Sequence, residues 1–142
     1  MADRTAEVTW RGSLLEGGGT IDRVGSGAFG PLDVTWASRA EEPQGRTSPE
    51  ELVAAAHASC FSMALSGALA RAGSPPEQLR TSATVTFVPG TGITKSALRV
   101  RGTVPGMDDA AFREHAEAAK QGCPVSQALA AVPEITLDAA LE

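Results

Sequence analysis

The two cysteines, Cys60 and Cys123, are the residues of this 142-residue chain whose type most directly offers redox chemistry. A thiolate is a nucleophile, and it can be oxidised reversibly to a sulfenic acid or a disulfide. The two cysteines do not form a C-x-x-C motif, so their spacing alone does not predict a redox pair. On residue counts alone, both also fit small buried hydrophobic side chains, because free cysteine is among the most buried residue types.

Local sequence distinguishes the two thiols. Cys123 lies between Gly122, which ends one predicted helix, and Pro124, the first residue of the next. Unpaired N–H groups and the helix dipole favour a thiolate there, so local physics predicts Cys123 as the better nucleophile. Cys60 lies in the uncharged stretch of residues 54–70, where desolvation raises the pKa of a thiol. Cys60 is therefore expected to react near neutral pH only if a cation is brought to it.

Two further residues could supply that charge. His57 precedes Cys60 by one helical turn, although a histidine packed by its apolar edge explains the position equally well. Arg39 follows the predicted third strand, just before the long helix. A guanidinium is always charged and can pair with a carboxylate while it faces a sulfur. By position alone, Arg39 also fits an ordinary surface arginine, and the residues leave both alternatives open.

Other chemistries fit the sequence less well. Ser62 and Ser66 lack a nucleophile elbow, and residues 17–19, three glycines, lack the lysine and helix of a phosphate-binding loop. A set of two sulfurs and two imidazoles could in principle bind zinc, namely Cys60, His57, Cys123 and His115. Their spacings match no compact zinc pattern, so no metal site is expected.

Charge and composition narrow the partners. The 12 basic residues are scattered and outnumbered by 17 acidic ones, and aromatic content is only 4% with no tyrosine. We therefore expect no nucleic-acid partner. The N-terminal sequence MADRTAEVTW has no apolar run that could serve as a signal peptide, so a cytoplasmic protein is expected. Residues 52–70 are long enough to span a bilayer, but their Ala, Ser and His content favours a helix buried in a soluble core or interface.

The elements that must position these residues follow from hydrophobic periodicity and turn signals. A long helix is predicted from Pro49 to about Arg71, with Ser48 as its N-cap and Glu51 completing a capping box. Strands are predicted over residues 7–10, 20–24, 32–38, 79–88, 93–104 and 134–139, and two further helices over 107–122 and 124–131. The order βββ-α-ββ-αα-β indicates a single α+β domain over residues 1–142, with largely antiparallel sheets.

Several longer motifs carry a family resemblance. Residues 48–52 (SPEEL) are followed by residues 55–65 (AAHASCFSMAL) and later by residues 119–129 (AKQGCPVSQAL). Together with residues 93–95 (ITK) and 134–138 (EITLD), they resemble the osmotically inducible protein C (OsmC) family, which is related to the organic hydroperoxide resistance (Ohr) proteins. The resemblance covers nearly the whole chain, and two of the motifs each contain a cysteine.

The resemblance implies a cysteine-based peroxidase that reduces organic hydroperoxides and, less efficiently, hydrogen peroxide. By the resemblance, Cys60 is the peroxidatic cysteine that becomes a sulfenic acid, and Cys123 is the resolving cysteine that forms a disulfide with it. Arg39 is then the cation that holds the Cys60 sulfur as a thiolate, and Glu50 orients its guanidinium. These roles reverse the order that local physics predicts, but a nearby cation and a dry site suit attack on an alkyl hydroperoxide.

The resemblance also implies an assembly and a reductant. Family members are intertwined homodimers, with sheets wrapped around a long central helix, and act in oxidative and osmotic stress. They use no bound cofactor and are reduced by a lipoyl-type or other dithiol. The departures from the family pattern lie in the first strands and loops, at residues 27–30 and Ala40, and leave both thiols in place.

One geometric condition follows for Glu50. On a straight helix, Glu50 and Cys60 are separated by roughly 15 Å of rise. One arginine can serve both residues only if the helix is broken between them or if a partner chain completes the site. An alternative function from another class is a dimer that binds a small hydrophobic ligand without catalysis.

Overall fold

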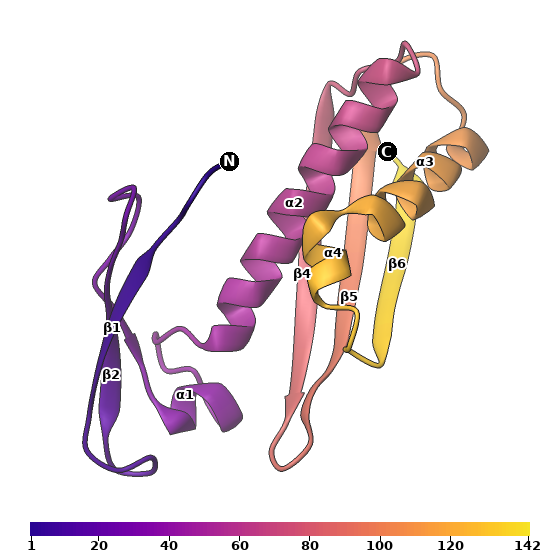
Figure 1. Ribbon diagram of the computed structural model, residues 1–142. Helices are drawn as coiled ribbons and strands as arrows, with labels where there is room; N and C mark the ends of the chain where they lie inside the picture. The colour runs from indigo at the N-terminus through magenta and orange to yellow at the C-terminus, as the bar shows by residue number, and fades with distance from the viewer. The chain divides into compact units, whose positions relative to one another are not determined.

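The computed structural model describes residues 1–142 (Figure 1). The chain forms two compact units, Met1–Leu52 and Val53–Glu142. The boundary falls in the first turn of the long helix α2 (Pro49–Arg71).

The N-terminal unit contains a three-stranded antiparallel meander, as predicted. Its strands are β1 (Ala6–Arg11), β2 (Gly18–Val24) and β3 (Leu32–Val34), in the order β1-β2-β3. Ile21 is the only buried hydrophobic side chain of this unit, whereas Val8, Trp10 and Leu15 are exposed. The meander therefore encloses almost no core of its own.

The predicted order of elements is wrong at one point, because the third strand ends at Val34 and a short helix α1 (Trp36–Ala40) follows it. A capping box starts this helix. The Thr35 hydroxyl accepts a hydrogen bond from the Ser38 backbone N–H at 3.0 Å, and the Ser38 hydroxyl bonds the Thr35 N–H at 2.9 Å. The β-branched and aromatic residues favour a strand, but the Thr-x-x-Ser cap decides the local structure. The order is βββ-αα-ββ-αα-β.

Ser48 caps the start of α2 as predicted, but the predicted capping box with Glu51 does not form. The Glu51 backbone N–H donates to the Ser48 hydroxyl at 3.2 Å, as expected for an N-cap serine. The Glu51 carboxylate accepts from the Thr47 hydroxyl at 2.9 Å, so it secures the chain one residue before the cap. The helix then continues without a break from Pro49 to Arg71.

The C-terminal unit pairs a three-stranded sheet with helices. Strands β4 (Gln78–Val88) and β5 (Gly92–Thr103) form an antiparallel hairpin, and β6 (Glu134–Leu141) pairs with β5 in parallel. Helices α3 (Asp109–Gly122) and α4 (Pro124–Ala128) connect β5 to β6. The α+β class is confirmed, with predicted boundaries met within one or two residues except at β3 and at α4, which ends before residue 131.

The hydrophobic core lies between this sheet and the helices. In Figure 1, α2, α3 and α4 lie over one face of β4, β5 and β6. Helix α2 buries one side chain per turn along a single stripe, namely His57, Phe61, Leu65 and Leu69. The three hydrophobic side chains share one core cluster with Leu98 and Val100 of β5 and Phe112 and Ala116 of α3. A Cβ at Gly102 would lie 2.7 Å from the Phe112 ring, so the absence of a side chain lets the ring rest on β5.

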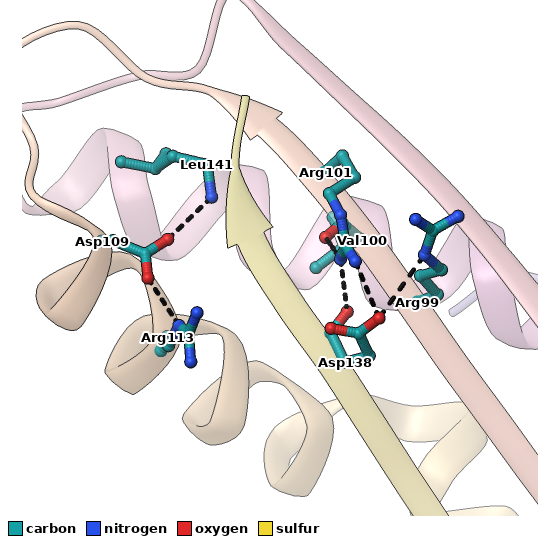
Figure 2. Close-up of polar contacts among 7 residues, drawn as sticks. All are labelled: Arg99, Val100, Arg101, Asp109, Arg113, Asp138 and Leu141. Carbon is teal, nitrogen blue, oxygen red and sulfur yellow. Dashed lines mark hydrogen bonds and ion pairs between the residues drawn. The ribbon is translucent and has the colours of Figure 1, made fainter.

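Polar contacts join β6 to helix α3 and to strand β5 (Figure 2). The Asp109 carboxylate accepts from the Leu141 backbone N–H at 2.9 Å and pairs with Arg113 at 2.6 Å. The Asp138 carboxylate pairs with Arg101 at 2.8 Å and with Arg99 at 3.4 Å on β5. The C-terminal strand is therefore tied both to α3 and to the sheet.

Helix α2 is apolar beyond its buried stripe. By length and composition it could cross a membrane, and 22% of its most apolar window is buried within the chain. Its other faces carry mostly small or apolar residues, among them Val53, Ala55, Ala56 and the exposed Met63. A helix that is apolar on all sides is also typical of one buried by further protein.

Candidate functional site

The structure brings the two cysteines together. Cys60 lies on α2 at the edge of its buried stripe, and Cys123 links the end of α3 to the start of α4. Cys60 packs against the buried cluster that contains Cys123, each thiol shifts the pKa of the other, and both thiols are free. Cys60 is half-buried, whereas Cys123 has no exposed surface. Of the two sulfurs, Cys60 is the one that a solvent molecule can approach in this chain.

The backbone around Cys123 has a helix-cap geometry. The Cys123 N–H donates to Ala119 O at 2.9 Å, which closes α3, and its carbonyl accepts from the Gln127 N–H at 3.0 Å, which opens α4. Pro124 stands at the first position of α4, where its missing N–H costs nothing. The Cys123 side chain therefore sits over the N-terminus of α4, as the sequence predicts.

This position lowers the pKa of Cys123. Burial alone would raise the pKa, but hydrogen bonds from the Ser126 backbone N–H, the Cys60 thiol, the Ser126 hydroxyl and the Val125 N–H together bring it below the ordinary value. For Cys60 the balance is opposite. Burial and the contact with Cys123 raise its pKa, against a smaller lowering by the Val125 N–H.

His57 is completely buried beside the thiols. Its Nδ1 lies 2.7 Å from the Ser96 Oγ on β5, and its Nε2 lies 2.8 Å from the Ser126 Oγ on α4. Burial lowers the pKa of the imidazole, which favours the neutral ring. Both ring nitrogens are occupied by hydroxyl groups, so His57 has no nitrogen available for a metal. No group of three or more His, Cys, Asp or Glu residues is placed to hold a metal ion.

The structure also brings the predicted arginine and glutamate together, within the N-terminal unit. The Arg39 Nε lies 3.0 and 3.2 Å from the two Glu50 carboxylate oxygens, and its Nη2 donates to Glu50 Oε1 at 2.8 Å. The Glu50 side chain is only 8% exposed and that of Arg39 is 32% exposed. A bidentate pair of this kind fixes the plane of the guanidinium.

Helix α2 is not broken between Glu50 and Cys60, so the first of the two conditions that we stated for Glu50 is not met. No break in the helix shortens the roughly 15 Å of rise that separates Glu50 from Cys60. A broken helix is therefore not the way in which one arginine could serve both residues.

Ser62 has structural partners. Ser62 hydrogen-bonds with the Ala58 carbonyl at 2.8 Å and the Thr81 hydroxyl at 2.7 Å, which ties α2 to β4. His115 lies on α3, half-buried.

Sequence reasoning missed Ser96 and Ser126 as neighbours of the site. Ser126 stands three residues after Cys123, which is the spacing at which the third residue of a helix meets its cap, so a signal for it was present. Ser96 comes from a distant strand and had no such signal.

The two thiols, one at a helix N-terminus and one beside the buried stripe of α2, lie in a protein of the α+β class. The OsmC-like protein family model matches residues 42–138. The chain therefore belongs to the OsmC-like family.

Individual relatives agree with this assignment. The chain is 43% identical over 138 residues to Peroxiredoxin OsmC of Escherichia coli K12, covering 95% of this chain and 94% of that one. Among solved structures, the organic hydroperoxide resistance protein OhrB of Bacillus subtilis has 25% identity and a TM-score of 0.65, with 97% and 98% of the two chains covered. The organic hydroperoxide resistance protein of Elizabethkingia anophelis shares the fold, with 22% identity, a TM-score of 0.70 and coverage of 97% and 96%.

Proposed function

We propose that the protein is a cytoplasmic, homodimeric thiol peroxidase that reduces organic hydroperoxides and, less efficiently, hydrogen peroxide. The assignment as a peroxidase rests on its identity of 43% with Peroxiredoxin OsmC over nearly the whole of both chains. The preference for organic hydroperoxides is supported by the similarity to the B. subtilis organic hydroperoxide resistance protein. The observation that carries the mechanism is the contact between Cys60 and Cys123.

Exposure supports Cys60 as the sulfur that meets the peroxide. Cys123 has the lower pKa but no exposed surface, whereas Cys60 is partly accessible. A thiol that substrate cannot reach gains nothing from being a thiolate in the first step. Its position beside Cys60 suits it instead for the second step, in which the electrophile is a neighbouring sulfur.

The proposed reaction has two sulfur steps. The Cys60 thiolate attacks the outer oxygen of the hydroperoxide, so that an S–O bond forms, the O–O bond breaks, and the alkoxide leaves and is protonated to the alcohol. The Cys60 sulfenic acid is then attacked by Cys123, which forms the disulfide and releases water. A lipoyl-type or other dithiol reduces the disulfide and restores both thiols.

Cys60 needs a cation for the first step, because its surroundings raise the pKa of the thiol. We propose that the Arg39–Glu50 pair of a partner chain supplies it. Glu50 holds the guanidinium by three hydrogen bonds, and the continuity of α2 supports a partner chain as the source of this charge. A nearby guanidinium stabilises the thiolate and the departing alkoxide.

A homodimer also accounts for the exposed apolar surface of α2. Four side chains along one stripe of the helix are fully buried in the core of the C-terminal unit, namely His57, Phe61, Leu65 and Leu69. The small residues on its other faces permit close approach of a second helix. We propose that the partner chain covers them.

Peroxide consumption tests this function. The protein is incubated with cumene hydroperoxide and dihydrolipoate, and hydroperoxide loss is followed. We expect catalytic turnover in the wild type and only background loss in Cys60→Ser, with Ser62→Ala as a matched control on the same helix. Absence of turnover in the wild type, or equal turnover in Cys60→Ser, would rule out the proposal and favour a non-catalytic ligand-binding role.

A further inference from the structure

A chain of buried hydrogen bonds runs from the interior of the C-terminal unit to Ser126, three residues after Cys123. It starts at Ser96 on β5, passes through both nitrogens of His57 on α2, and reaches Ser126 on α4 at distances of 2.7 and 2.8 Å. Ser96 and His57 have no exposed surface, and Ser126 is 7% exposed. No buried side-chain nitrogen or oxygen lacks a hydrogen-bond partner.

The donors in this chain have a defined direction. A serine hydroxyl has one proton, and the contribution of the Ser126 hydroxyl to the lowered pKa of Cys123 requires that this proton faces the sulfur. The Ser126 oxygen must then accept from His57, which places a proton on Nε2. In a neutral imidazole, Nδ1 is then an acceptor, and it receives the Ser96 proton. Every donor in the chain points toward Cys123.

We propose that His57 is a positioning residue for the resolving step: held as the Nε2–H tautomer by Ser96, it aims the Ser126 hydroxyl at the Cys123 sulfur and stabilises the attacking thiolate. This inference rests on the proposed function, because it assigns a role within the step that closes the Cys60–Cys123 disulfide. This chain of hydrogen bonds contains no carboxylate, which suits a buried site because an added charge there would be costly.

The step balances without a further reactant. The Cys123 thiol loses its proton, the thiolate attacks the Cys60 sulfur, the new S–S bond forms and the S–O bond of the sulfenic acid breaks. The released hydroxide takes up one proton and leaves as water. The Ser126 hydroxyl donates a hydrogen bond to the Cys123 sulfur while the sulfur carries negative charge. The hydroxyl keeps its own proton throughout.

The titratable groups beside Cys123 are few. Cys60 of α2 acts on it directly, and His57 of α2 reaches it only through Ser126. Ser96 of β5 and Ser126 of α4 are neutral. The charged residues that flank these elements are already paired, Lys120 with Glu117 at 2.7 Å and Lys95 with Glu134 at 2.7 Å. Lys120 also lines the surface hollow at Ser126. The pH dependence of the resolving step is therefore expected to report the Cys123 thiol.

Two replacements of His57 separate its two hydrogen bonds. In His57→Gln, the amide N–H₂ reaches the place of Nε2 and keeps the donor to Ser126. In His57→Asn, the shorter amide reaches only the place of Nδ1 and loses that donor. Ser126→Ala removes the hydroxyl with little change in volume, so it tests the same chain if the histidine variants fail to fold. Ser62→Ala is the control, since it removes a different hydroxyl from α2.

The readout is the rate of Cys60–Cys123 disulfide formation against pH, followed by alkylation quench and mass spectrometry after one equivalent of cumene hydroperoxide. Loss of a hydrogen bond to a charged group is expected to slow this step about tenfold near neutral pH in His57→Asn and Ser126→Ala. The rates should converge with wild type at high pH, where Cys123 is ionised in every variant. His57→Gln should stay near wild type. In a Cys60→Ser background, the pKa of Cys123 should rise in His57→Asn.

Other outcomes would overturn the inference. An unchanged pH profile in His57→Asn, or a loss in His57→Gln as large as in His57→Asn, would show that His57 does not aim Ser126. A uniform loss at all pH values would indicate a structural role only. Absence of a Cys60 sulfenic acid or disulfide in the wild type would instead contradict the proposed function itself, so the two failures are distinguishable.

Discussion

The two units of this chain differ in how much hydrophobic core they contain and in which polar or reactive side chains they carry. The N-terminal unit, Met1–Leu52, buries a single hydrophobic side chain, Ile21, but carries the bidentate Arg39–Glu50 pair. The C-terminal unit, Val53–Glu142, contains the hydrophobic core, both thiols and the buried His57. The first unit is rich in fixed charge and poor in core, and the second is the reverse.

This difference separates stability from activity. Substitutions in the C-terminal core should affect folding, because burial is the dominant favourable term in folding. Substitutions of the N-terminal charged pair should affect chemistry with little effect on folding of the C-terminal unit.

The largest effect should come from truncation in the core. Phe112→Ala is expected to cost about 3–5 kcal/mol of the free energy of unfolding, because the buried ring packs against β5 at Gly102. The same change at Phe29, whose side chain is 43% exposed, should cost about 1 kcal/mol or less. Urea denaturation measures both. Equal losses would contradict the division between the two units.

The second largest effect should come from Arg39→Ala. Loss of the charge should lower the rate of Cys60 oxidation about 10²–10³-fold at neutral pH, a magnitude typical of removing one electrostatic stabiliser. Since burial raises the pKa of Cys60, the rate of the variant should recover as pH rises and the thiol ionises. Stopped-flow kinetics over a pH series measures this.

Arg39→Lys is the matched control for that prediction. It keeps the positive charge but not the bidentate pairing with Glu50, so its rate should lie between those of wild type and Arg39→Ala. If Arg39→Ala reacts as fast as wild type at every pH, Arg39 does not stabilise the Cys60 thiolate.

Subunit mixing gives a smaller but more specific effect. If the cation comes from the partner, refolded mixtures of Arg39→Ala and Cys60→Ser chains should recover about a quarter of wild-type activity, since half of the dimers contain one complete site of two. Peroxidase assays of each variant alone and of the mixture measure this. If both residues act within one chain, the mixture should show no gain over the separate variants.

The smallest effect concerns the tie between α3 and β6 (Figure 2). The hydrogen bond from the Leu141 N–H, together with Arg113, lowers the pKa of Asp109 in the folded state. A lowered carboxyl pKa contributes stability that is present above its unfolded value of about 4 and is lost as pH falls through the folded value. In Asp109→Asn, the free energy of unfolding should therefore fall less steeply than in wild type as the pH is lowered below about 4. Identical slopes in urea titrations would contradict this.

Much of this fold could be predicted from the sequence, because its signals are local. The Ser48-Pro49 start of α2, the Gly122 end of α3 and the strands around residues 89–91 each depend on neighbouring residues. Helix α1 was missed because a Thr-x-x-Ser cap competes with strand propensity over only five residues. The parallel pairing of β6 with β5 depends on a distant partner, so no local pattern could show it.

The site was predictable to a lesser degree. The helix-start position of Cys123 indicated its lowered pKa, and the structure agrees. The pairing of Cys60 with Cys123 and of Arg39 with Glu50 was implied by family resemblance and not by spacing. The hydroxyls on either side of His57 come from β5 and α4, elements far apart in sequence, and only the folded chain reveals them.

The most direct test of the account is mass spectrometry of the wild type and of Cys123→Ser after one equivalent of cumene hydroperoxide. The account predicts a Cys60–Cys123 disulfide in the wild type, and a Cys60 sulfenic acid, trapped by dimedone, in Cys123→Ser. A sulfenic acid on Cys123 in Cys60→Ser, with Cys60 unmodified in Cys123→Ser, would contradict it and restore Cys123 as the attacking thiol.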